Sequence, residues 1–308
     1  MSNLFMRIFE GHPQLTQRDY FFFKGYFIGP ERQCAAAREN FSYMPGYDNW
    51  QELTYQKALE DCQGFIKSTE EQASFLAFTR SILGKIPLMK DHAHHLLPPA
   101  IPFETLPPKP TVTDPKIDSP SSPDNDTPNP SFLPTRFLLT LTPIFIIRHP
   151  AHIVASFLRA VSKTDMMAVD NPEFATATAF QPMIQLMDFY RANGIEPIVI
   201  DGGRLVNNTK RVISELCEKV GVDESIVKYE WEPRVIPEKF VGTGMDSFAG
   251  TAWRSTGVQK ERGTEKPVVI EEEVKKWEDE WDVETAKIME KLVRESMADY
   301  EKMLGYAI

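Results

Sequence analysis

The chain has 308 residues, 42% of them hydrophobic and 25% charged, with a formal net charge of −10. This acidic balance disfavours broad nucleic-acid binding, which needs a basic surface, although a local group of arginines and helix N-termini can still bind an anion. The sequence has no run of ~18 apolar residues to span a membrane and no secretory signal at its start. We therefore expect a cytoplasmic protein that binds neither nucleic acid nor membrane, and the oligomeric state stays open.

The first third of the chain predicts helices followed by one strand. In chain order we expect a helix at 2–10, an aromatic core or pocket segment at 18–27, helical segments within about 50–84, and a strand in 85–92. Ser2 is the expected N-cap of the first helix, and Gly11 is expected to end it. Gly64, followed by the polar sequence STEEQ, is expected to break the helical segment.

Residues 98–134 differ from the rest of the chain in composition. Twelve of the 24 prolines fall there, among Ser, Asp, Asn and Thr. Such a segment has too few apolar residues to repay the entropy of ordering, which predicts a loop or a disordered insertion. Strand signals resume directly afterwards in FLLTLTPIFII, so we interpret residues 1–308 as a single domain that contains this insertion.

The second half alternates strands and helices. We expect helices at 150–164 and 172–193, a strand at 197–201, a helix ending at Gly221, and a long solvated amphipathic helix at 271–304. Strands separated by helices predict an α/β fold of three layers, with a mostly parallel sheet flanked by helices. Cys34, Cys62 and Cys217 lie far apart and are expected to be buried or incidental thiols.

Ligands of parallel sheets gather beyond the carboxyl ends of the strands, and three predicted strands end in polar residues. The strand IFII ends at Arg148, and Pro150 suits the first position of the following helix. Arg148 offers a charged fork that matches phosphate, and Ser156, two turns on, offers a hydroxyl. The alternative is an arginine paired with a core carboxylate and an ordinary helical serine. Local physics favours neither interpretation.

Arg-x7-Ser at a strand-to-helix junction resembles the 3′-phosphate element of sulfotransferases that use 3′-phosphoadenosine-5′-phosphosulfate (PAPS). The segment IIRHPAHIVASFLRA is similar to the corresponding segment of the sulfotransferase-like P-loop proteins common in fungi. PIVIDGGRLVNNTKRVISELCEKVGVD and GTAWRSTGVQK are similar to later parts of the same family. The resemblance covers most of 136–304. It implies a sulfotransferase-like fold, PAPS as cofactor, and Arg148 with Ser156 as ligands of the 3′-phosphate.

The catalytic histidine of that family follows a strand in a Lys-x-His arrangement, which Lys90 and His92 match. A histidine can take the proton of an acceptor hydroxyl as the hydroxyl attacks sulfur. A nearby lysine can stabilise charge on the transferred group or on the leaving phosphate. His94 and His95 also allow a metal site, but no further ligands stand at a recognisable spacing, so we predict none.

The family's 5′-phosphosulfate loop has the form Pro-Lys/Arg-x-Gly/Ala-Ser/Thr-x and follows a first strand. In this chain only the end of that loop has a counterpart, with Ser2 and Asn3 in the loop and Leu4 at the start of its helix. The first strand, the proline and the basic residue are absent. We therefore expect either a shortened version of a longer protein or a site that has decayed or been reused.

Three further segments of the second half carry polar or charged residues. Arg254, Ser255 and Gly257 are weaker candidates for the 3′-phosphate, and residues 201–203 are expected to form a turn at a strand end. The acidic run EEEVKKWEDEWD is expected to be a solvated helix face.

The leading hypothesis is sulfuryl transfer from PAPS to a hydroxyl of a small organic acceptor, and the resemblance implies a role in secondary metabolism. His92 would be the base and Lys90 the charge stabiliser. The alternatives are a non-sulfating biosynthetic enzyme on the same scaffold, or a catalytically inactive binding or scaffold protein.

Overall fold

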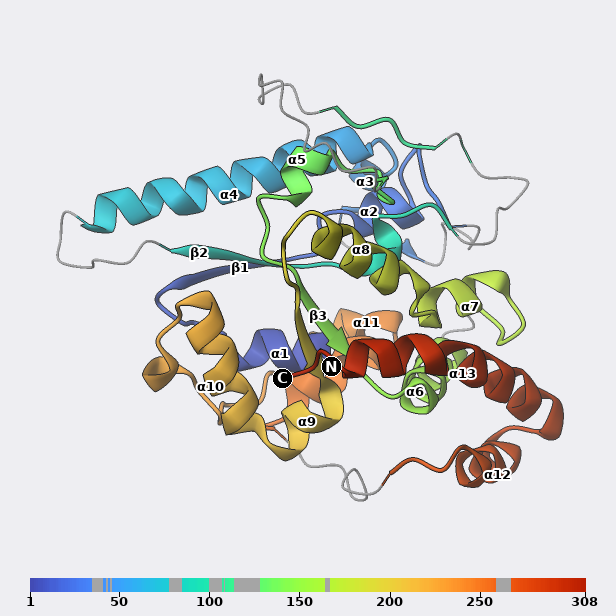
Figure 1. Ribbon diagram of the computed structural model, residues 1–308. Helices are drawn as coiled ribbons and strands as arrows, with labels where there is room; N and C mark the ends of the chain where they lie inside the picture. The colour runs from blue at the N-terminus through green and yellow to red at the C-terminus, as the bar shows by residue number, and fades with distance from the viewer. Residues whose placement is uncertain are drawn as a thin grey trace. The chain divides into compact units, whose positions relative to one another are not determined.

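A computed structural model gives the structure of the chain (Figure 1). The described residues are 1–34, 41, 42, 44, 46–77, 85–99, 107, 109–113, 128–163, 167–258 and 267–308, without the side chains of 72–77. They group into two compact units. Unit 1 comprises 1–9, 144–184 and 198–308, and unit 2 comprises 10–143 and 185–197. Most of the predicted insertion at 98–134, and the end of the predicted helical segment at 78–84, lie outside the described residues.

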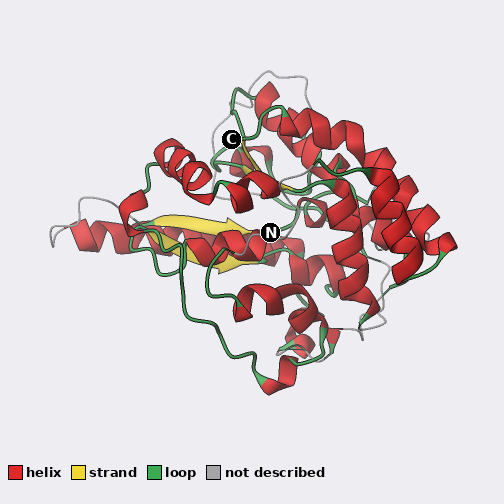
Figure 2. Ribbon diagram, turned by 90° about the horizontal axis from the view of Figure 1, so that it is seen from below, coloured by secondary structure: helices red, strands yellow, loops and turns green. Residues whose placement is uncertain are grey.

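Unit 2 contains a pair of parallel strands, β1 (Leu15–Asp19) and β2 (Ile86–Lys90), which run side by side (Figure 2). Their register places Leu15 opposite Ile86 and Asp19 opposite Lys90. The expected strand in 85–92 is therefore confirmed, whereas β1 was not predicted. Its sequence, LTQRD, has little apolar content, and its residues are half-buried or exposed. Such a strand lacks the hydrophobic pattern on which sequence prediction depends.

The helices of unit 2 supply most of its core. They are α2 (Phe23–Phe27), α3 (Tyr47–Trp50), α4 (Tyr55–Ala77), α5 (Thr135–Leu138) and the part of α8 (Gln181–Ala192) from Gln185 on, with a 3₁₀ turn at Ala93–His95. α4 packs against β2 and continues through Gly64, so the break predicted there is wrong. An isolated glycine only weakens a helix, and packing of the helix can outweigh that cost.

Unit 1 contains a second parallel pair, β3 (Ile144–Ile147) and β4 (Ile198–Asp201). Ile144 lies opposite Ile198, and Ile147 lies opposite Asp201. Residues 307 and 308 extend the pairing beyond β4, because the N–H of Ile308 donates to the carbonyl of Val199 at 3.0 Å. Strand IFII is confirmed, but Phe137 and Leu138, upstream of it, lie in α5 of unit 2 rather than in a strand.

The helices of unit 1 follow the predicted chain order, with two that the sequence did not predict, at Gly202–Asn207 and Gly244–Arg254. They are α1 (Ser2–Ile8), α6 (Pro150–Ser162), α7 (Pro172–Thr178), α9 (Gly202–Asn207), α10 (Thr209–Val220), α11 (Gly244–Arg254), α12 (Ile270–Glu280) and α13 (Val283–Leu304). Short 3₁₀ turns occupy Glu224–Ile226 and Glu238–Phe240. α10 ends as predicted at Gly221, whose φ of 69° suits glycine. The N-cap of α1 is Met1, so the prediction of Ser2 as the cap is wrong.

Two predicted long helices are each divided in the structure. The helix expected at 172–193 breaks at Ala179, whose ψ of 147° is extended, giving α7 and α8. The helix expected at 271–304 breaks at Trp281, and Asp282 starts α13 by accepting a hydrogen bond from Thr285 N at 2.9 Å. Asp282 is the kind of residue that caps a new helix, which is why the helical pattern restarts there.

α12 and α13 also build the core of unit 1. Trp277 and Met289 are fully buried, together with residues of α6 and α7, in one hydrophobic cluster. The expected solvated helix is thus amphipathic, as predicted, but its apolar side carries much of the core of unit 1. Glu271, Glu272 and other acidic residues of EEEVKKWEDEWD are exposed as expected, whereas Trp277 within that run is not.

The architecture is therefore mixed α/β with short parallel strand pairs, which is the coarse class that the sequence predicts. The three-layer arrangement of a full P-loop sheet remains a prediction. Cys34, Cys62 and Cys217 are free and buried, as expected. Within the described residues, no helix is long and apolar enough to cross a membrane.

Candidate functional site

Lys90 ends β2, and the pairing of the strands places it opposite Asp19 at the end of β1. Its Nζ lies 3.0 Å from Asp19 Oδ2 and 4.4 Å from the centre of the Tyr20 ring. The side chain of Lys90 is 6% exposed and that of Asp19 is 46% exposed. Burial lowers the pKa of the Lys90 ammonium, and the Asp19 carboxylate opposes that shift. Asp19 therefore compensates the buried positive charge of Lys90 at the ends of the two strands.

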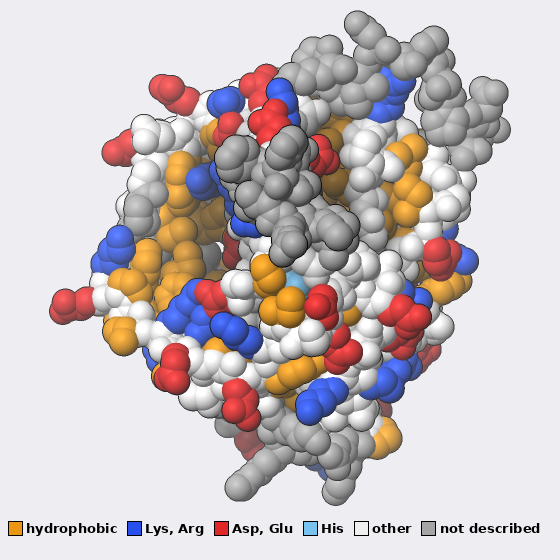
Figure 3. Space-filling view, turned by 90° about the vertical axis from the view of Figure 1, so that its left-hand side faces the viewer, with side chains coloured by type: hydrophobic (Ala, Val, Ile, Leu, Met, Phe, Trp, Pro, Cys, Tyr) orange, Lys and Arg blue, Asp and Glu red, His pale blue; other side chains and the backbone are white. Residues whose placement is uncertain are grey.

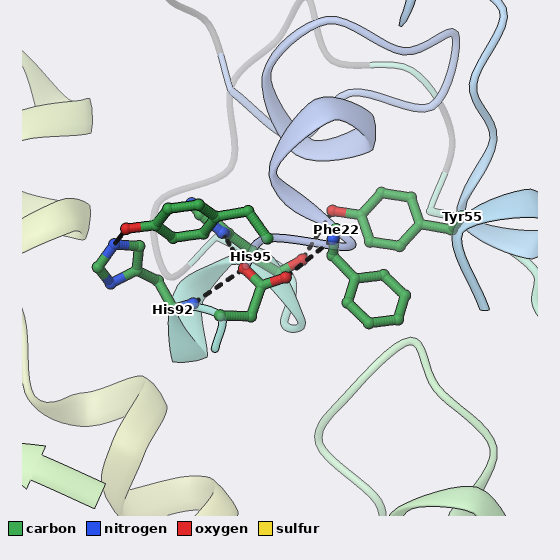
Figure 4. A network of polar contacts seen from close by, with 6 residues as sticks. Phe22, Tyr55, His92 and His95 are labelled. Carbon is green, nitrogen blue, oxygen red and sulfur yellow. Dashed lines mark hydrogen bonds and ion pairs between the residues drawn. The ribbon is translucent and has the colours of Figure 1, made fainter. Parts of the chain in front are cut away.

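Asp91 bonds to both loops that follow β1 and β2. Figure 4 shows this network around the labelled Phe22, His92 and His95. Its Oδ2 accepts a hydrogen bond from the Phe22 N–H at 2.8 Å, and its Oδ1 accepts from the His92 N–H at 2.9 Å. Oδ1 also lies 2.5 Å from Nδ1 of His95, whose side chain is 1% exposed. The Tyr55 hydroxyl donates to the His95 carbonyl at 2.8 Å. This network fixes the backbone from which the His92 side chain projects.

His92 is exposed and lies between two other rings. Its ring stacks on Tyr20 with centroids 5.5 Å apart and on His94 with centroids 5.4 Å apart. Its Nε2 is 3.4 Å from the Tyr20 hydroxyl (Figure 4). Desolvation by the crowded surroundings, with His95 second, lowers the pKa of His92 to about 3. The imidazole of His92 is therefore neutral at pH 7 and has a lone pair.

His94 and His95 belong to an aromatic cluster. The His95 ring contacts Tyr26 at 4.9 Å and Phe27 at 5.4 Å between centroids, and His94 lies 4.5 Å from His95. Burial lowers the pKa of His94 well below its usual range. Among the described residues, no three His, Cys, Asp or Glu side chains gather as metal ligands. The aromatic segment 18–27 is thus partly core, and part of it lines the histidines.

Arg148 and Ser156 lie in unit 1, at the end of β3 and on α6. Arg148 is half-buried, and Ser156 is exposed with its hydroxyl donating to the Ile153 carbonyl at 3.1 Å. Between them His149 caps α6, because its Nδ1 accepts the Ala151 N–H at 3.2 Å. Burial, with His152 second, lowers the pKa of His149 to about 4. The strand-end position predicted for Arg148 is confirmed, whereas its role as a phosphate ligand stays a prediction.

The other predicted site residues have local partners. Ser2 and Asn3 lie in the first turn of α1, and the Asn3 amide donates to the Phe248 carbonyl of α11 at 3.0 Å. Arg254 pairs with Asp246 at 2.7 Å. The Ser255 hydroxyl accepts from Trp231 Nε1 at 3.2 Å. These contacts give Asn3, Arg254 and Ser255 structural roles, and the proposed roles of all four residues in binding remain predictions.

The turn expected at 201–203 is wrong, because Asp201 ends β4 and α9 begins directly at Gly202. Asp201 also carries a buried contact. Its Oδ1 accepts the Arg204 N–H at 2.9 Å as the N-cap of α9, and the Tyr300 hydroxyl donates to its Oδ2 at 3.2 Å. The Tyr300 ring packs edge-on against His149, with centroids 5.3 Å apart. The described part of unit 1 therefore links the ends of β3 and β4 through α13.

The sequence did not predict that Asp19 and Tyr20 lie beside Lys90 and His92, nor that Asp91 connects the loops after β1 and β2. The Lys-x-His pattern pointed to β2 alone, because β1 was not recognised as its neighbour. Tyr20 has a φ of 55° and is the only non-glycine residue with a positive φ among those described. Such a conformation costs a bulky residue on the order of 1–3 kcal/mol and is concentrated at functional sites. Only its position in the dense aromatic run could have drawn attention to it.

With this geometry in view, comparison with known proteins gives a consistent class. The chain is related to proteins named sulfotransferase. It is 31% identical over 189 residues to sulfotransferase ppzF of Metarhizium majus, which is 56% of this chain and 54% of that protein. It is 30% identical over 189 residues to sulfotransferase ppzF of Metarhizium rileyi. The chain thus spans about half the length of these curated relatives. No family model and no solved structure matches it.

On the face drawn in Figure 3, Lys and Arg side chains are interspersed with Asp and Glu, and hydrophobic side chains lie exposed among them. This face therefore carries charges of both signs rather than a continuous basic field.

Proposed function

We propose that this protein transfers a sulfuryl group from PAPS to a hydroxyl of a small organic acceptor, with a role in secondary metabolism. The observation that carries the proposal is the pair formed by Lys90 and His92 at the end of a parallel strand, in a chain related to sulfotransferases. Arg148 and Ser156 bind the 3′-phosphate in this proposal, and Ser2 and Asn3 lie near the 5′ end of the nucleotide.

The polar groups of Arg148 and Ser156 are of the kinds that bind a phosphate. Arg148 offers a permanently charged fork that is half-buried at the end of β3, and Ser156 offers an exposed hydroxyl on the adjoining helix. Both groups suit phosphate oxygens. The first free N–H of α6 already has a partner in His149, so binding in this proposal depends on side chains more than on the helix end.

PAPS, when bound, supplies a sulfuryl group attached to a phosphate that can leave. His92 is neutral at pH 7 and accepts the proton of the acceptor hydroxyl at a ring nitrogen. The oxygen of that hydroxyl then bonds to sulfur as the bond from sulfur to the phosphate oxygen breaks. Lys90, whose ammonium lies 3.0 Å from Asp19 in the structure, neutralises the negative charge that develops on the leaving oxygen.

Calorimetry with 3′-phosphoadenosine-5′-phosphate tests the binding part of this proposal. We expect micromolar affinity in the intact chain and its loss in Arg148→Ala. Arg211→Ala is the matched control, because Arg211 is an exposed arginine on α10 that pairs with Glu215 at 3.4 Å. Absence of binding to the unmodified chain would sink the proposal. Binding without any sulfate transfer would instead favour the binding-protein alternative.

A further inference from the structure

Tyr20 is held in place by its backbone. It follows Asp19, the last residue of β1, and its N–H donates to the Lys90 carbonyl at 2.7 Å. This bond extends the pairing of β1 and β2 by one residue beyond the strands. The φ of 55° at Tyr20 then turns the chain away from the strand direction. The positive φ is therefore maintained by a short backbone hydrogen bond to the residue that carries the candidate ammonium.

The Tyr20 side chain touches both candidate catalytic groups. One contact is the hydroxyl, 3.4 Å from His92 Nε2, and the ring of Tyr20 stacks on the imidazole at an interplanar angle of 28°. The other contact is the ring face, with Lys90 Nζ 4.4 Å from its centre, a favourable cation–π geometry. Phe23 packs against the same ring, with centroids 5.6 Å apart. A single side chain thus sets the ring plane of His92 and one wall of the Lys90 site.

We propose that Tyr20 is a positioning residue that orients His92 and Lys90 for the transfer reaction. This inference rests on the proposed function. The Tyr20 hydroxyl donates to Nε2, which selects the tautomer of His92 with its proton on Nδ1 and leaves the lone pair on Nε2. When the acceptor binds, its hydroxyl replaces the Tyr20 hydroxyl as the hydrogen-bond donor to Nε2. Once Nε2 has received the acceptor's proton, the Tyr20 oxygen accepts a hydrogen bond from the new Nε2–H.

The burial and charge of the surroundings agree with this assignment. The imidazole is neutral, so one ring nitrogen must accept a hydrogen bond and the other must carry the proton. The positive charge of the Lys90 ammonium adds to the lowering of the pKa of His92, which favours the neutral imidazole with its lone pair. Asp19 balances that ammonium from the side of the strand, at 3.0 Å.

Tyr20→Phe is the decisive variant, because it removes the hydroxyl and keeps the ring, the stacking and the contact with Lys90. Nitrogen-15 NMR of the histidine rings reports the tautomer directly. We expect the Nδ1–H form of His92 in the intact chain and a shift toward the Nε2–H form in Tyr20→Phe. Tyr229→Phe is the matched control, since it removes a hydroxyl bonded to Glu224 in unit 1. Unchanged His92 nitrogen shifts in Tyr20→Phe would overturn the inference.

Kinetics provide a second readout. With saturating PAPS we expect kcat to fall about fivefold to tenfold in Tyr20→Phe and about 100-fold in Tyr20→Leu, which also loses the ring. The KM for PAPS should stay within about twofold, because Tyr20 acts on the reacting groups. Undiminished kcat in Tyr20→Leu would contradict the inference. If the intact chain transfers no sulfate, the proposed function fails, and the NMR result alone decides the role of Tyr20.

Discussion

Replacement of Asp91 by alanine tests whether this carboxylate holds the candidate site together. The variant leaves the N–H of buried Phe22 without its acceptor, which costs about 1–3 kcal/mol. It also removes the charged acceptor of the buried His95 imidazole, which costs about 1.5–3 kcal/mol. The N–H of exposed His92 can bond to water instead. We therefore expect a total loss of about 2.5–6 kcal/mol in the free energy of unfolding.

Urea unfolding followed by far-ultraviolet circular dichroism measures this loss as a lower midpoint at unchanged slope. Asp91→Asn retains one oxygen but turns an amide N–H₂ toward Phe22 N, and it should lose about 1–3 kcal/mol. Asp61→Ala is the control, because Asp61 forms only an exposed pair with Lys57 at 3.0 Å, worth about 0.5 kcal/mol. If Asp91→Ala were no more harmful than Asp61→Ala, the account of the network in Figure 4 would be refuted.

Three further predictions concern unit 1. The pKa of His149 is lowered from 6.5 to about 4, so between these pH values the unfolded chain binds more protons than the folded chain. The free energy of unfolding therefore falls by roughly 1–3 kcal/mol as the pH drops from 6.5 to 4. In His149→Asn, which keeps a helix cap, this part of the pH dependence of urea unfolding should vanish, and an unchanged dependence of stability on pH would contradict the prediction. Met289→Ala should cost about 2–5 kcal/mol in the same assay and the exposed Lys291→Ala below about 0.5 kcal/mol, so equal effects would remove α13 from the core. Arg159→Ala removes a bidentate but exposed ion pair with Glu280 and should lower the free energy of unfolding by no more than about 1 kcal/mol. A larger loss of stability on thermal unfolding would contradict this expectation.

Hydrophobic patterning predicted the elements that bury apolar residues. The strands IFII and IVID, the helix that begins at Pro150 and the glycine end of α10 all carry strong local signals, and each lies where the sequence places it. The breaks at Ala179 and Trp281 do have local signals, Pro182 and the capping residue Asp282. The helical pattern continues on both sides of each break, so two helices were predicted as one in each case. The strand LTQRD was missed because its pairing with β2, rather than its own composition, makes it a strand.

The candidate site shows the same division. Lys90, His92 and Arg148 could be predicted because they follow recognisable strands. Asp19 and Tyr20 could not, because their roles arise from the register of β1 against β2 and from a single positive φ. Neither property leaves a periodic pattern in the sequence. Residues placed by tertiary pairing therefore need the structure, whereas residues placed by local strand ends do not.

Transfer of labelled sulfate from PAPS tests the central claim most directly. The full chain would be incubated with PAPS carrying sulfur-35 and a mixture of small phenols and alcohols, and labelled products would be separated from the donor. The account predicts labelled acceptor with the intact chain and at least about a 100-fold lower rate in His92→Ala. No labelled product from the intact chain, or an undiminished rate in His92→Ala, would contradict it.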